Sequence, residues 1–143
     1  MKLLIFGVLS LLTIKSVLSQ TNEWLKLYTG NGVEFFYQKS ECHDIQNGIH
    51  EEYYLIQIHN TSNNSLQLQW NYHLWNGENC INCKENLSDI KAFNAKILPG
   101  ETIEGSCKNK TQNGLKIFSR FLNYKTANPV THFTVENINV KFD

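Results

Sequence analysis

Residues 66–75 read LQLQWNYHLW, and this stretch decides the fold. Apolar and polar side chains alternate along it, a period of two that is typical of a β-strand with one buried face. The apolar set is Leu66, Leu68, Trp70, Tyr72 and Leu74, and the other set is Gln67, Gln69, Asn71 and His73, followed by Trp75. We therefore predict a central strand that places Trp70 in the core.

Other stretches rich in β-branched and aromatic residues lie on either side of it. Residues 60–65 and 98–101 separate them with Asn, Ser, Pro and Gly, which favour turns. Residues 24–28 are interpreted as an apolar lead-in, and residues 84–93 as the one candidate for a helical turn. The predicted strands are residues 33–39, 51–59, 66–75 and 93–97, a short run near Ile103, and residues 115–122 and 131–142.

The last predicted strand changes its alternation partway along. Phe133 and Val135 share one parity, whereas Ile138 and Val140 take the other. A single buried face continues through such a change only if an extra residue is inserted. We therefore predict a β-bulge near residues 136–137.

Short strands separated by turn signals predict an all-β fold, an antiparallel β-sandwich of about seven strands. In Trp70 of its third strand, and in the turns at residues 60–61 and 98–101, the chain resembles small immunoglobulin-like β-sandwich domains of exported bacterial proteins. The resemblance covers roughly residues 33–142 and implies an immunoglobulin-like architecture, without an antibody-like function. Cys42 and Cys107 depart from the antibody pattern, because they do not fall in the middle of the second and sixth strands.

Residues 1–19 have the features of a cleaved signal peptide. Lys2 gives a basic start, residues 3–14 are almost wholly apolar, and Ser19 precedes the expected cut. We therefore expect residues 20–143 to form a single β-sandwich domain that is secreted or periplasmic. The apolar run is too short for a membrane span, and no second one follows, so no transmembrane segment is expected.

The charges argue against a nucleic-acid partner. Lys and Arg total 13, and Asp and Glu also total 13. The basic residues are scattered, without the cluster or stripe that neutralises phosphates.

Four cysteines in the exported part predict disulfide bonds, because oxidising compartments favour them in small domains. Three pairings are compatible with the sequence. We favour Cys42 with Cys107 and Cys80 with Cys83, since the close pair can close a tight turn while the distant pair lies at strand ends. The long link would contribute roughly 4 kcal/mol in the loop-entropy account of disulfide stabilisation.

The segment Cys80-Ile81-Asn82-Cys83 also carries the alternative function. A C-x-x-C pair can exchange disulfides when one thiolate is stabilised, or can supply two ligands to a metal together with His43 or His73. Thiol exchange of this kind normally uses a helix start near a βαβ unit, which this sequence does not predict. A second C-x-x-C or a paired-histidine motif is also missing, so a structural disulfide is the favoured interpretation.

The sequence favours binding over catalysis. It has no nucleophile elbow and no distinctive carboxylate pair, so we expect a non-catalytic protein without a cofactor. Tyr53, Trp75 and Phe118 lie on the parity opposite to the core and form the candidate binding surface for a protein, peptide or glycan. Alternatively, these rings pack beneath loops or against the segment that contains Trp24. The resulting hypothesis is a secreted binding or envelope-associated module.

Overall fold

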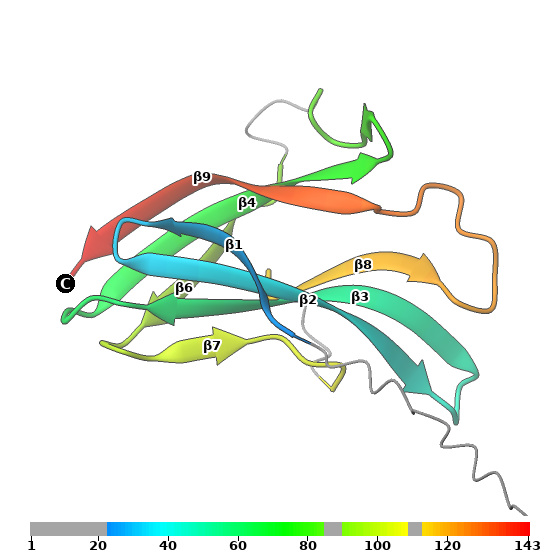
Figure 1. Cartoon of the computed structure of the whole chain (residues 1–143), viewed down its shortest axis with the longest axis horizontal. Coiled ribbons are helices and arrows are strands. Elements are labelled where there is room, and N and C mark those ends of the chain that lie inside the picture. Colours follow the sequence, from blue (N-terminus) through cyan, green and yellow to red (C-terminus); the bar gives the residue numbers. More distant parts are fainter. Residues whose placement is uncertain (1–22, 85–89, 109–112) are drawn as a thin grey trace, which may run out of the picture.

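The computed structural model describes residues 23–84, 90–108 and 113–143, and the regular structure in these ranges is entirely β (Figure 1). The predicted signal peptide, and residues 85–89 of the predicted helical turn, lie outside the described residues. The strands are β1 Leu25–Gly30, β2 Val33–Asp44, β3 Ile49–Asn60, β4 Leu66–Asn76, β5 Asn79–Cys80, β6 Phe93–Ile97, β7 Thr102–Glu104, β8 Lys116–Phe121 and β9 His132–Phe142.

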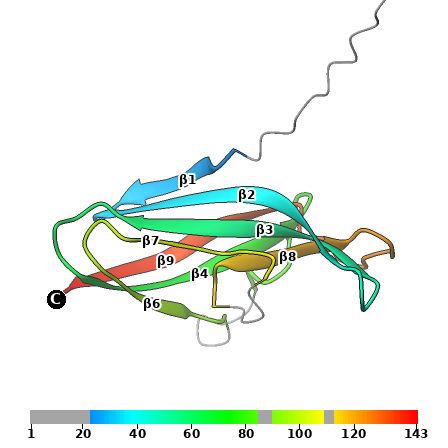
Figure 2. The same ribbon diagram turned by 90° about the horizontal axis from the view of Figure 1, so that it is seen from below.

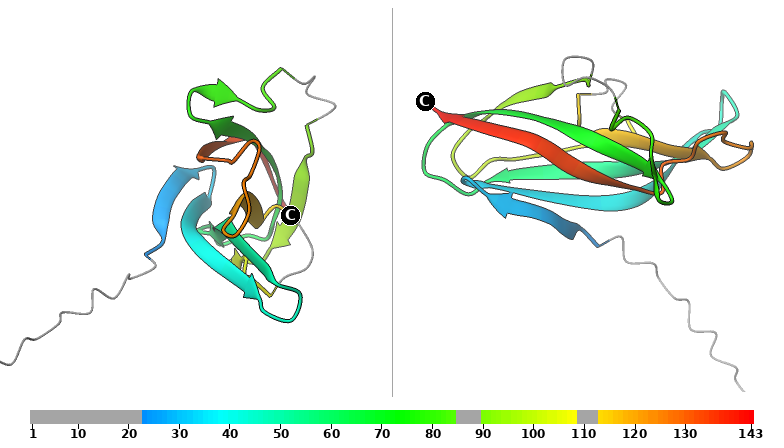
Figure 3. Two further views of the ribbon diagram at one scale, coloured as in Figure 1. Left: turned by 90° about the vertical axis from the view of Figure 1, so that its right-hand side faces the viewer. Right: turned by 90° about the horizontal axis from the view of Figure 1, so that it is seen from above.

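These strands form two antiparallel sheets that pack face to face. In sheet A, β3 pairs with β2 on one side and with both β7 and β8 on the other, and β1 extends the sheet beyond β2. In sheet B, β4 is central and pairs with β9, β6 and the short β5. The two layers are seen edge-on in Figure 2 and from the end of the sandwich in the left view of Figure 3. The predicted all-β antiparallel sandwich is thus confirmed, whereas its immunoglobulin-like identity stays a prediction.

The core lies between the sheets and contains the buried face predicted for residues 66–75. Trp70 is 0% exposed, and its ring meets the rings of Phe35 and Phe93 at centroid distances of 6.0 and 5.8 Å. The other large contributors to this core are Val33, Tyr54, Ile56, Ile58, Leu66, Leu68, Tyr72, Ile97 and Phe133. Side chains of β4 with the parity of Trp70 therefore face sheet A, and those of the opposite parity face outward.

The predicted bulge in β9 is confirmed. Gln69 pairs with Asn139 and Asn71 pairs with Glu136, so two residues of β9 lie opposite the single residue Trp70. Asn137 at the bulge has a φ of 51°, a left-handed conformation that asparagine tolerates better than most residues. The bulge keeps Ile138 and Val140 directed toward the core.

The sequence interpretation was wrong at the beginning of the domain. Residues 25–30 form the edge strand β1, which pairs with β2 through a tight turn at residues 31–32. The turn takes positive φ at Asn31 (52°) and Gly32 (76°), as a two-residue hairpin requires. The strand lacks clear alternation because its pairing with β2 shifts register between Lys26 and Tyr28, and none of its residues is fully buried. With β1 and the very short β5, the sandwich has more strands than the seven predicted.

Asn60 joins three segments at one end of the sandwich. Its side chain is 0% exposed. The amide nitrogen Nδ2 donates to the carbonyls of Asn64, Ile97 and Leu98 at 2.8, 3.2 and 2.9 Å, and Oδ1 accepts from the backbone and hydroxyl of Ser62. One side chain therefore fixes the β3–β4 turn against the end of β6.

Candidate binding surface on the outer face of sheet B

Two rows of polar side chains cross the outer face of sheet B, the face turned away from the core. Each row takes one residue from β6, β4 and β9, and its members are cross-strand partners. The rows are Asn94–Gln69–Asn139 and Lys96–Gln67–Lys141, and we call these six residues the polar face. Neighbouring strands lie roughly 5 Å apart, so each row extends over roughly 10 Å.

All six residues of the polar face are exposed. A hollow of about 120 Å³ is lined by five of them, together with Leu68. Within the described part of the chain, no protein group forms a hydrogen bond with the side-chain amides of Gln69, Asn94 or Asn139. An amide offers one acceptor oxygen and two donor hydrogens, so the row presents three unused donor–acceptor groups to a ligand.

The second row carries an uneven charge. Lys96 Nζ lies 2.7 Å from Asp143 Oδ2, and this hydrogen bond lowers the pKa of the Asp143 carboxyl. Gln67 also bonds to that carboxylate. Among the described residues, no ion pair involves Lys141. The corner of the polar face at β9 is therefore cationic.

The outward side of β4 continues from Gln69 to an aromatic platform. Asn71 is 5% exposed, and the His73 ring lies 3.7 Å from the Glu136 carboxylate. Trp75 is half-buried and stacks on His132, with ring centroids 5.5 Å apart and planes 11° from parallel. Trp75 is six positions along β4 from Gln69, a distance of roughly 20 Å in an extended strand.

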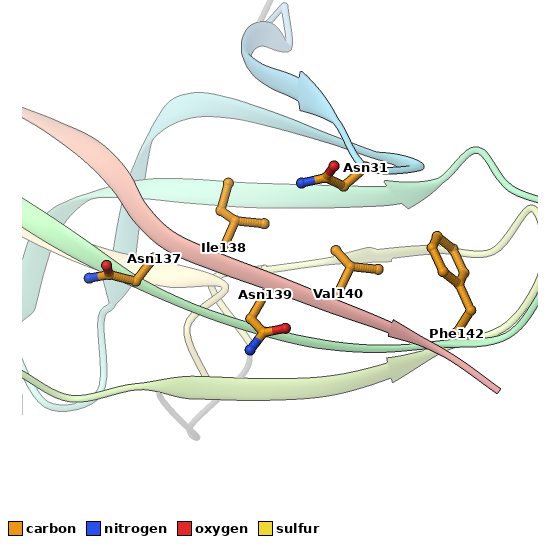
Figure 4. A pocket seen from close by; sticks show the side chains of 6 residues that line it. All are labelled: Asn31, Asn137, Ile138, Asn139, Val140 and Phe142. Atoms are coloured by element: carbon orange, nitrogen blue, oxygen red, sulfur yellow. The ribbon is translucent and has the colours of Figure 1, made fainter.

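A larger groove adjoins the polar face along the outer edge of β9. Its volume is about 510 Å³. Figure 4 shows that Ile138, Val140 and Phe142 project from one side of β9, toward the β1–β2 turn, and that Asn139 projects from the other. The residues that line the groove are Asn31, Asn137, Ile138, Asn139, Val140 and Phe142. It therefore combines amide groups with apolar side chains.

The three predicted binding residues do not form one surface. Tyr53 and Phe118 pack together in sheet A, with ring centroids 5.6 Å apart, while Trp75 belongs to sheet B. Tyr53 is only 8% exposed and lies in a small apolar cluster with Cys42, against which Phe118 and Trp24 pack. For Tyr53 and Phe118 the alternative interpretation from the sequence is therefore the right one, because these rings pack against the N-terminal segment that contains Trp24. Trp75 lies on the same side of sheet B as the polar face, toward the other end of β4.

Both predicted disulfide pairings are present. Cys42 in β2 is bonded to Cys107, which follows β7, and Cys80 is bonded to Cys83. The long link covers the outer side of sheet A, where Cys42 is buried. It therefore ties the loop after β7 to β2 close to the β2–β3 turn.

The short link closes a turn that is held against β4. Asn82, between the two cysteines, accepts a hydrogen bond from the backbone nitrogen of Leu74 at 2.9 Å and donates to the carbonyl of Tyr72 at 2.9 Å. These contacts use backbone groups of β4 that lie between its segment paired with β6 and its segment paired with β5. The Cys80–Cys83 disulfide thus closes a turn that is fixed to the edge of β4.

The surroundings of Cys80 and Cys83 do not favour thiol exchange or metal binding. The sulfur atoms are bonded to each other, and residues 81–84 form bends and turns, without a helix start that would stabilise a thiolate. In the part of the chain that the structure describes, no group of three or more His, Cys, Asp or Glu side chains is arranged to hold a metal ion.

Comparison with protein-family models, with curated proteins and with solved structures found no match. In residues 23–84, 90–108 and 113–143, no helix has the length and apolar character needed to cross a membrane.

Sequence reasoning singled out Trp75 but missed Asn94 and Asn139. Each lies between two apolar residues in a short strand, so its outward direction could be read from the alternation. That both flank Gln69 depends on strand pairing, which no local pattern specifies. The signal present in the sequence was the amide character of the outward positions in residues 66–75.

Proposed function

We propose that this protein is an exported, non-catalytic module that binds a glycan through the polar face of sheet B. The observation that carries the proposal is the row Asn94–Gln69–Asn139, three exposed amides without protein partners around one hollow. Neighbouring hydroxyls of a sugar ring each donate and accept, and a side-chain amide matches both roles in one plane. The row extends over about the length of a disaccharide.

The surroundings of this row favour a polar ligand over a protein partner. Protein interfaces usually have a core rich in aromatic and other apolar side chains. Among the described residues, the exposed large apolar side chains are Leu25, Ile45, Ile49, Ile81, Leu98, Phe121, Tyr124 and Phe142, and none belongs to the polar face. Nucleic acid is also disfavoured, because the face carries only two lysines and Asp143 neutralises one of them.

Two neighbouring features extend the proposed site. Trp75, stacked on His132, offers a flat ring roughly 20 Å along β4 from Gln69, a length that several linked sugars would cover. The groove in Figure 4 lies at the free edge of β9, on the side of that strand opposite to Asn139. A ligand that passed over this edge would meet apolar side chains, which suit the C–H faces of sugar rings. A chain of several sugars would thus make more contacts than a monosaccharide.

Export is the remaining part of the proposal. It is supported by the signal-like residues 1–19 and by two disulfide bonds, which form and persist mainly in oxidising compartments. The redox and metal alternative at Cys80 and Cys83 has no comparable observation in its favour.

The test is a glycan array on residues 20–143, followed by calorimetric titration with the oligosaccharides that bind. Gln69→Ala and Asn139→Ala should each weaken binding about tenfold, the effect of losing one or two hydrogen bonds. Gln38→Ala, a substitution of the same kind in sheet A, should leave the affinity unchanged. Absence of glycan binding at millimolar concentration, or equal affinity in the sheet B variants and the control, would refute the proposal.

A further inference from the structure

Two histidines face each other near the tip of the β2–β3 hairpin. This hairpin belongs to sheet A, whereas the polar face lies on sheet B. His43 and His50 are cross-strand partners. Their Nδ1 atoms lie 2.8 Å apart, and their rings have centroids 5.0 Å apart with planes at 56°. The short turn that joins the strands is closed by a hydrogen bond from Gly48 N to Ile45 O, with Gly48 at a φ of 64°. The hairpin therefore holds the two imidazoles side by side.

The separation of the two nitrogens matches a particular coordination geometry. Metal–nitrogen bonds to histidine are about 2.0 Å long, so two such ligands at right angles have nitrogens about 2.8 Å apart. At a tetrahedral angle the separation would be about 3.3 Å. In the metal-free chain this 2.8 Å contact is a hydrogen bond, with one Nδ1–H donating to the other Nδ1. A metal ion bound at a right angle would replace the shared proton at the same nitrogen–nitrogen separation. Square-planar or tetragonal sites of this kind favour Cu²⁺ or Ni²⁺ over Zn²⁺, and Cu²⁺ binds most tightly among these ions.

The remaining nitrogen of His43 has a carboxylate beside it. Glu41 Oε2 lies 3.5 Å from His43 Nε2, on the side of the ring opposite to His50. A carboxylate in this position orients a metal-binding imidazole and raises its basicity. The Glu41 carboxylate therefore favours a cation at this pair.

We propose that His43 and His50 form a surface site for one Cu²⁺ ion, with both Nδ1 atoms as cis ligands and water in the other positions. Binding shifts the proton shared by the two Nδ1 atoms to an Nε2 atom, and the rings rotate so that both Nδ1 lone pairs face the ion. The protein ligands of the proposed site are therefore two imidazoles, whose Nδ1 atoms are already adjacent. The site is independent of the proposed glycan-binding function.

The test is a Cu²⁺ titration of untagged residues 20–143, followed by calorimetry and by electron paramagnetic resonance. One bound Cu²⁺ with hyperfine coupling to two imidazole nitrogens is expected, and Zn²⁺ should bind at least about tenfold more weakly. His43→Ala and His50→Ala should each reduce Cu²⁺ affinity at least about tenfold. His59→Ala, in the same strand as His50, should not change it.

The pair lies at an exposed hairpin, so thermal unfolding of each variant verifies that the fold is kept. Cu²⁺ affinity that is unchanged in the His43→Ala and His50→Ala variants would show an adventitious ion only, and would overturn the proposal. A spectrum without two imidazole nitrogens, or no binding of Cu²⁺ at all, would overturn it as well.

Discussion

Replacing Asn60 by alanine should destabilise the domain strongly, although the sequence places Asn60 at the start of a polar turn. The substitution removes three hydrogen bonds donated by Nδ2 and two accepted by Oδ1. A typical hydrogen bond contributes about 1 kcal/mol net, and a buried carbonyl left without a partner costs about 1–3 kcal/mol. The carbonyl of Ile97 is such a group, because its bond to Asn60 is buried. The carbonyls and hydroxyl in the turn can bind water instead.

These terms give an expected loss of about 3–5 kcal/mol in the free energy of unfolding. For a domain of this size, that corresponds to a fall in Tm of roughly 10–20 °C. Urea unfolding followed by tryptophan fluorescence measures the change directly, since Trp70 is fully buried in the folded state. Asn63→Ala, an exposed position in the same turn, is the matched control and should cost under about 0.5 kcal/mol.

A second variant separates the donor role of Asn60 from its shape. Asn60→Asp keeps the size of the side chain but places a carboxylate oxygen against the carbonyls of Asn64, Ile97 and Leu98. It should therefore destabilise at least as much as Asn60→Ala. If Asn60→Ala and Asn63→Ala have the same stability, or if Asn60→Asp is tolerated, the turn is not held by these bonds and the reasoning fails.

Three further predictions concern the core, pH and the short disulfide. Trp70→Ala should cost about 3–5 kcal/mol in chemical unfolding, against under about 0.5 kcal/mol for Gln69→Ala, and equal costs would contradict the strand orientation. Burial raises the pKa of Glu52, but hydrogen bonds from Arg120 and Ser119 and the charge of Lys39 outweigh it, so the pKa is below its ordinary 4.5. The resulting stability is complete above that value and is lost as pH falls through the lowered pKa, a dependence that Glu52→Gln should weaken in Tm measurements across acidic pH. The Cys80–Cys83 bond should resist exchange with glutathione in disulfide mapping, and ready exchange would favour the redox alternative.

The parts of the fold that the sequence predicted are those fixed by local alternation. Trp70 lies in the core because residues 66–75 have a strict period of two, and the bulge at Asn137 was visible as a change of parity within one strand. The disulfide pairing also followed from chain spacing, since Cys80 and Cys83 are close enough to close a turn.

The remaining features depend on which strands become neighbours. Tyr53 has outward parity, but it is buried because Phe118 and Trp24 come to lie against it from distant parts of the chain. Asn60 looked like a loop residue because its partner carbonyls at Ile97 and Leu98 belong to another strand end. Parity gives the side of a sheet on which a residue lies, whereas burial on the outer side depends on what covers it.

The two parities of β4 make stability and the proposed binding separable within one strand. Trp70 faces the core and Gln69 faces outward, although they are adjacent in sequence. Core energetics depend on the volume and packing of the first, whereas a ligand on the polar face contacts only the second. Trp70→Phe should therefore lower Tm while leaving glycan affinity unchanged in the molecules that remain folded. Gln69→Ala should weaken glycan binding while leaving Tm unchanged. A change of both properties by either substitution would mean that the polar face is shaped by the core packing beneath it, and the site would then have to be described together with that core.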